Sequence, residues 1–137
     1  MKIIVDTNVI IDILLKREPF FASSYGALRH AIERGAICLV SASAMSDVFY
    51  LLGKTIKDTA KVIECLESLF RLVSVVDVLG SDIYASISTG FTDFEDAIIF
   101  LVALREQADL ILTRNAKDFV FSTIPVQDPA SYLAATS

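Results

Sequence analysis

Short apolar runs alternate along the chain with longer segments of mixed polarity. Five of these runs are rich in β-branched or aliphatic residues, and we predict strands at 2 to 5, 36 to 40, 72 to 76, 110 to 113 and 124 to 126. Because the runs contain few polar residues, we expect the strands to be buried on both faces.

The segments between the predicted strands show the apolar spacing of helices. Tyr25, Leu28 and Ile32 follow this spacing in the second segment, and each segment is long enough to cross back over a sheet. Repeated strand–helix units favour a parallel sheet with helices on both faces and right-handed crossovers. We therefore predict an α/β fold.

The start of one helix can be placed from local signals. Thr92 followed by Glu95 matches a capping box, which predicts a helix through FEDAIIFLVALREQ with Asp93 and Asp96 in its first turn. Asp96 then takes a position where an apolar side chain commonly packs against the residue before the cap, here Phe91. A charged residue that breaks this local rule suggests a functional site.

Length and composition indicate one domain. With 137 residues, 54% of them hydrophobic, we expect a single domain over residues 1–137. Asp6 and Asp12 interrupt the first apolar segment, so we expect no signal peptide, and no run is long enough to span a membrane. Cys38 and Cys65 lack CxxC spacing, so we expect reduced thiols and a cytoplasmic protein.

The charge pattern directs attention to aspartates. A net charge of −5 has the wrong sign for a broad basic face that grips nucleic acid. In a parallel sheet, however, ligands bind beyond the carboxyl ends of the strands. Five aspartates follow predicted strands or open the helices beside them, and we expect them to share one pocket: Asp6, Asp47, Asp93, Asp96 and Asp118.

Such a pocket suits Mg²⁺ or Mn²⁺, which prefer hard oxygen ligands. We predict Asp6 and Asp96 as metal ligands, together with Asp93 or Asp47. Three of them also have an ordinary structural explanation: Asp6 can cap a helix, Asp93 can complement a helix dipole, and an acid at 47 can face solvent. The bound metal would place positive charge where phosphate needs it.

The sequence has few of the residues that other kinds of catalytic site require. The only histidine, His30, has no partner for a zinc site, and there is no glycine-rich phosphate loop. Arg114 and Asn115 lie just past a predicted strand beside the acids, which makes them candidates for contacts with a substrate phosphate.

Four segments together resemble the PIN domain, the nuclease domain of VapC-type toxins in toxin–antitoxin pairs: IIVDTNVIIDIL, LVSASAMSDVFYLL, DFEDAIIFLVAL and ADLILTRNAKDF. The resemblance implies a five-stranded parallel sheet of order 3-2-1-4-5, a divalent-metal ribonuclease site, a homodimer and a protein antitoxin. The residues that it places at the site are Asp6 with Thr7 and Asn8 beside it, Asp47, Asp96, and Asn115 with Asp118 close by. The family usually has glutamate where this chain has Asp47.

The leading interpretation is a metal-dependent endoribonuclease that cleaves RNA as the toxin of a toxin–antitoxin pair. The shorter acid at 47 and the amide at 115 also allow a non-catalytic scaffold that binds RNA or a protein partner. A third interpretation is an aspartyl phosphoryl-transfer domain, with Asp77 or Asp6 as the acceptor. It fits less well, because Asp6 has no acidic neighbour.

Overall fold

The computed structural model describes residues 1–136. In chain order its elements are β1 (Lys2–Val5), α1 (Thr7–Leu14), α2 (Phe21–Glu33), β2 (Ile37–Ser41), α3 (Ala42–Ile56), α4 (Thr59–Phe70), β3 (Ser74–Val76), α5 (Gly80–Ser86), α6 (Phe94–Arg105), β4 (Leu110–Leu112), the 3₁₀ helix η1 (Ala116–Phe119), β5 (Val126–Gln127) and α7 (Pro129–Thr136). The strands form one parallel sheet in the order β3-β2-β1-β4-β5. The predicted fold class and strand order are confirmed.

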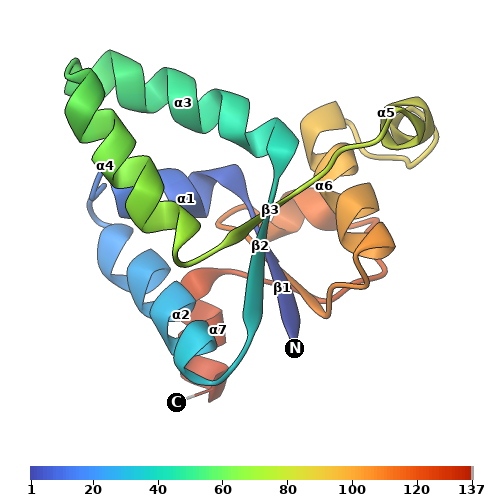
Figure 1. The fold of residues 1–137 in the computed structure, drawn as a ribbon. Coiled ribbons are helices and arrows are strands. Elements are labelled where there is room, and N and C mark those ends of the chain that lie inside the picture. Colours follow the sequence, from blue (N-terminus) through green and yellow to red (C-terminus); the bar gives the residue numbers. More distant parts are fainter. Residues whose placement is uncertain (137) are drawn as a thin grey trace.

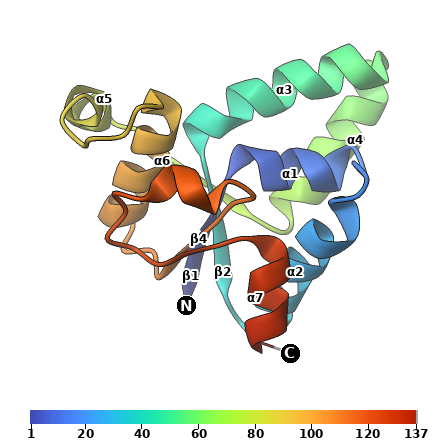
Figure 2. The ribbon, with the colours of Figure 1, turned by 180° about the vertical axis from the view of Figure 1, so that it is seen from behind.

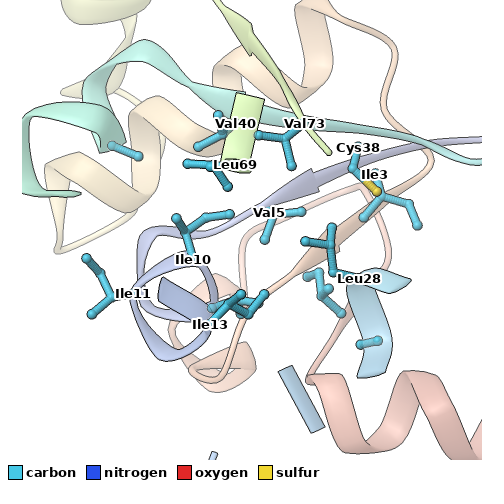
Figure 3. Close-up of a cluster of buried hydrophobic side chains, with 14 of the residues drawn as sticks. Ile3, Val5, Ile10, Ile11, Ile13, Leu28, Cys38, Val40, Leu69 and Val73 are labelled. Carbon is cyan, nitrogen blue, oxygen red and sulfur yellow. The ribbon is translucent and has the colours of Figure 1, made fainter. Parts of the chain in front are cut away.

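Helices cover both faces of this sheet (Figure 1). Ile3 and Val5 of β1 point to one face, where α1, α2, α3, α4 and α7 contribute to the core. Figure 3 shows this core around Ile3, Val5, Ile10, Ile11, Ile13, Leu28, Cys38, Val40, Leu69 and Val73. Ile4 points to the opposite face, against residues of α6 and η1. One strand therefore contributes to two separate cores, as expected when a parallel sheet is covered on both sides.

The predicted burial of the strands is correct in the centre of the sheet and wrong at one edge. All three residues of β4 are buried, whereas Ser74 and Val75 of the edge strand β3 are exposed. An edge strand has a neighbour on one side only, and the helices beside it leave part of β3 uncovered. Both cysteines are free, as predicted. Across residues 1–136 there is no helix with the length and apolar character needed to cross a membrane.

The sheet brings distant parts of the chain to one edge. β1 pairs with both β2 and β4, so the residues after these three central strands emerge side by side. The amide of Asp6 continues this pairing by donating to the carbonyl of Leu112 at 2.9 Å. The start of α6 reaches the same region from the other face of the sheet, since its acids interact electrostatically with Asp6. This edge holds the candidate site.

A candidate acidic site at the carboxyl edge of the sheet

Asp6 is held in place by bonds to both of its carboxylate oxygens. It is the N-cap of α1, and its Oδ1 accepts from the amide of Thr7 at 2.7 Å. Its Oδ2 accepts from the hydroxyl of Thr113 at 2.7 Å and from Nδ2 of Asn8 at 3.4 Å. Asp6 therefore does cap a helix, and its second oxygen is fixed by a residue just beyond β4.

Thr113 is a site residue that the sequence analysis missed. Its side chain is fully buried, and its hydroxyl donates to Asp6 while accepting from the amide of Asn115 at 3.1 Å. Nδ2 of Asn8 lies 3.4 Å from the same hydroxyl. A threonine between a buried strand and the Arg114–Asn115 pair was the only sequence signal. Its partner, Asp6, lies at the other end of the chain.

Burial raises the pKa of Asp6, and the negative charge of Asp93 raises it further. The hydrogen bonds from Thr113 and Thr7 lower this pKa, and so does the positive charge of Arg114. Because desolvation is the largest of these influences, the folded protein resists placing a negative charge here. A cation beside Asp6 would relieve that cost.

The predicted N-cap of α6 is wrong by one residue. Asp93, not Thr92, is the N-cap, and its carboxylate accepts from the amides of Glu95 at 2.9 Å and Asp96 at 3.1 Å. Aspartate is at least as good a cap as threonine, so this helix had two competing caps and the later one is used. Asp96 is then the third residue of the helix, and the argument from a broken apolar contact does not hold.

Asp96 is the most perturbed acid of the cluster. Burial and the charges of Asp6, Asp93, Asp118 and Glu95, in that order, raise its pKa to about 7. The structure thus brings three of the other predicted aspartates, Asp6, Asp93 and Asp118, within electrostatic reach of Asp96. A carboxyl group with a pKa near neutral and several anionic neighbours is typical of a functional site.

Asp47 is linked to the other acids by Glu95, a residue that the sequence analysis did not assign to the site. Asp47 and Glu95 both line a water-sized hollow of about 10 Å³, together with Thr7, Ser43, Ala44 and Ile99. The charge of Asp47 is the largest cause of the raised pKa of Glu95. Glu95 was interpreted only as a capping residue. The sequence feature that could have identified Glu95 is its position next to Asp96 in an acidic first turn.

Arg114 and Asn115 lie beside the acids as predicted, but Arg114 is already engaged. Its Nε donates to Oδ2 of Asp12 at 2.6 Å and its Nη2 to Oδ1 at 3.3 Å. Its backbone amide donates to Oδ1 of Asn8 at 3.2 Å. Asn115 is exposed and precedes η1, which carries Asp118. The contacts of these residues with a substrate stay a prediction.

The donors of the cluster fit a hard divalent cation in kind and in charge. They are carboxylate oxygens, and mutual repulsion and burial raise the pKa of Asp6, Asp96 and Glu95. Within residues 1–136, however, no group of three or more His, Cys, Asp or Glu side chains is already arranged to hold a metal ion. Carboxylates that repel one another rest apart, so side-chain rotation would have to bring them together around an ion.

The raised pKa of Asp96 gives a signed prediction for stability. Between its unfolded value of 3.8 and about 7, this carboxyl binds more protons in the folded state than in the unfolded state. The free energy of unfolding of the metal-free protein therefore falls as the pH rises through this window. Asp96→Asn should remove this contribution. Urea unfolding in EDTA at about pH 5 and about pH 8 measures it, and the gain of the variant over the wild type should be larger at the higher pH.

Comparisons with known proteins agree with this architecture. A family model described as PIN domain matches residues 2–117. Ribonuclease VapC1 of Aquifex aeolicus (strain VF5) is 27% identical over 130 residues, covering 91% of this chain and 88% of that protein. The crystal structure of VapBC2 from Rickettsia felis bound to a promoter DNA fragment has a TM-score of 0.74 at 16% identity, covering 93% of this chain and 98% of the matched chain. VapC20 of Mycobacterium tuberculosis, a sarcin-ricin loop cleaving toxin, has a TM-score of 0.62 at 16% identity, covering 80% and 86%.

Proposed function

Because the chain belongs to the PIN domain family, we propose that it is a divalent-metal-dependent endoribonuclease that hydrolyses RNA phosphodiester bonds. One observation carries this proposal. Asp6, Asp93, Asp96 and Asp118 interact at the carboxyl edge of the sheet, where Asp96 has a pKa of about 7. The family match supports the proposal from the sequence, and the electrostatic interactions among these acids support it from the fold.

We also propose that the protein is a cytoplasmic toxin with a protein antitoxin, that it forms a homodimer, and that residues 1–137 are one PIN domain. The relative from Aquifex aeolicus is named a ribonuclease. The Rickettsia felis structure contains a VapBC pair, and the Mycobacterium tuberculosis protein is described as a toxin. These descriptions support an RNA substrate and an antitoxin partner for this chain.

In the proposed mechanism, Asp6 and Asp96 hold the metal, which we expect to be Mg²⁺ or Mn²⁺, with help from Asp93 or Asp47. When bound, the ion supplies Lewis-acid stabilisation of the phosphate and lowers the pKa of an attacking water. Thr113 and the amide of Thr7 keep Asp6 oriented before any ion arrives.

The rim of the site is suited to the substrate. Thr7 lines the hollow beside Asp47, and Asn8 bridges Asp6 to the Arg114 backbone. We propose that Thr7, Asn8, Arg114 and Asn115 contact the RNA. Asp118 is exposed in η1 and adds negative charge to the cluster. That charge strengthens the attraction for a cation.

A cleavage assay tests the proposal. Purified protein is incubated with total RNA, tRNA and a structured RNA, in EDTA and in Mg²⁺ or Mn²⁺. Fragments that form only with the divalent ion support the nuclease. Metal binding without cleavage of any of these RNAs would favour the non-catalytic scaffold. This alternative is kept because no group of acidic side chains in residues 1–136 is already arranged to hold a metal ion. Membership of the PIN family leaves the phosphoryl-transfer interpretation without support.

Asp47 and Glu95 are expected to act as a pair, because both line the small hollow beside the other acids. Asp47 is one methylene shorter than the glutamate usual in the family, so we expect it to reach the ion through a water. Asp47→Asn and Glu95→Gln should each reduce cleavage by about 10–100-fold, the range typical of groups one layer outside a metal. Asp47→Glu should raise the rate at low metal.

Cleavage rates measured across a Mn²⁺ titration distinguish these roles. If Asp47→Asn is as inactive as Asp96→Asn at every metal concentration, Asp47 binds the ion directly. If Glu95→Gln matches the wild type throughout the titration, Glu95 has no part in metal binding or cleavage.

A further inference from the structure

A second hollow lies beside the acidic site, between the start of α2 and the start of α7, two helices that pack side by side (Figure 2). It encloses about 230 Å³ and is lined by Phe20, Ser23, Arg114, Asp128, Pro129 and Ala130. Arg114 connects it to the acids, because the neighbouring residue Thr113 donates to Asp6. The hollow is therefore next to the proposed cleavage site but does not overlap the proposed metal ligands.

Arg114 presents a rigid, flat surface to this hollow. Its guanidinium carbon lies 3.8 Å from the centroid of the Phe20 ring. Its Nε and Nη2 both donate to the carboxylate of Asp12, which is fully buried. Among residues 1–136 the third nitrogen, Nη1, has no hydrogen-bond partner, so it can donate to a ligand. An arginine fixed in this way loses little side-chain freedom when it binds a second group.

The lining indicates which part of a nucleotide fits. Phe20 is 37% exposed, and Pro129 and Ala130 add an apolar wall. The carboxylate of Asp128 lies at the rim, where it caps α7 by accepting from the amide and hydroxyl of Ser131 at 2.8 and 3.0 Å. Asp128 opposes the charge of Arg114 in the same hollow, and Asp12 already pairs with that guanidinium, so a phosphate fits less well than an uncharged group. A base has no charge, and it can stack on an aromatic ring or on a guanidinium plane.

We propose that this hollow is a subsite for one base of a single-stranded RNA, next to the nucleotide whose phosphodiester bond is cleaved. Phe20 and Arg114 provide the stacking surface, and Nη1 of Arg114 is available to donate to the same RNA. This inference rests on the proposed function, because it takes RNA as the substrate. It adds a named contact away from the acids and a preference for unpaired RNA.

The test is a coupling experiment between Phe20 and individual bases. Binding of a fluorescein-labelled single-stranded RNA of mixed sequence is measured by anisotropy in the Asp6→Asn background, so that no RNA is cut. The same RNA is then used with one base removed at each position in turn. Phe20→Leu should weaken binding of the intact RNA about fivefold or more, as expected when one stacked base is lost.

Removal of the base that occupies the hollow should weaken binding to the parent protein by a similar factor and have little further effect in Phe20→Leu. Phe70→Leu, at an exposed phenylalanine that ends α4, is the matched control and should change neither value. Ala130→Glu, which adds a second carboxylate at the rim, should weaken binding as Phe20→Leu does. Thermal unfolding verifies that each variant is folded.

The inference is overturned if Phe20→Leu binds the intact RNA as tightly as its parent, or if each missing base has the same effect in both proteins. Failure of the proposed function has a different signature, in which the wild type cuts no RNA with any divalent ion while the coupling at one base is still measured. In the active protein, Phe20→Leu should raise KM and leave kcat within about twofold.

Discussion

Asp96→Asn and Asp6→Asn are each expected to reduce metal-dependent RNA cleavage by about a hundredfold or more, beyond the usual loss from a group outside the ligand layer. Each change removes the anionic oxygen of a proposed metal ligand while nearly conserving side-chain volume. Neither variant should unfold. Asp6→Asn keeps an oxygen that can accept from the amide of Thr7, and Asp96→Asn removes a charge that four acidic neighbours oppose. Initial rates at saturating Mn²⁺ measure the effect.

The matched control is Asp58→Asn, at the exposed N-cap of α4, where asparagine caps as well as aspartate. It should cleave RNA at the wild-type rate. In a bacterial host, expression of the wild type and of Asp58→Asn should slow growth, and Asp6→Asn should not. Cleavage at the wild-type rate by Asp96→Asn, with an unchanged metal requirement, would remove that residue from the site.

Arg114→Leu is expected to lower the free energy of unfolding by about 3 kcal/mol, the lower part of the range for breaking a buried ion pair. Asp12 is fully buried and Arg114 is 24% exposed, so the two partners are not equivalent. Loss of Arg114 leaves a buried carboxylate for which the hydroxyl of Ser24, at 3.2 Å, is the one remaining donor among residues 1–136. Loss of Asp12 leaves an arginine that can turn to water. Asp12→Asn should therefore cost less than Arg114→Leu.

Urea unfolding at neutral pH measures these differences, with Arg29→Leu as the matched control. Arg29 pairs with Glu33 on the surface of α2, where both side chains are more than half exposed. Removing an exposed pair should lower the free energy of unfolding far less than Arg114→Leu does. The double variant Asp12→Asn with Arg114→Leu should be more stable than Arg114→Leu alone, because it leaves no uncompensated charge. Equal losses from Arg114→Leu and Arg29→Leu would show that the Asp12 pair contributes little.

Several features of the site could be predicted because they depend on local pattern. Asp6 directly follows a buried strand, and carboxyl ends of parallel strands meet at one edge, so its location was determined as soon as the strands were recognised. Asp93 and Asp96 come just before a run of apolar residues, which placed them at a helix start. The cap itself was misassigned, because Thr92 and Asp93 are both good caps and only the folded chain selects between them.

The sequence by itself determined the alternation of strands and helices, the parallel sheet, and the acids at its carboxyl edge, since burial and periodicity are properties of neighbouring residues. The tertiary structure alone decided which side chains meet. Thr113 donates to Asp6 across 107 positions, and Arg114 pairs with Asp12 across 102. Glu95 lies beside Asp47 because α3 and α6 begin at the same edge of the sheet. Such contacts depend on how whole elements pack, and no local spacing along the chain encodes the distance between two elements that are brought together only by folding.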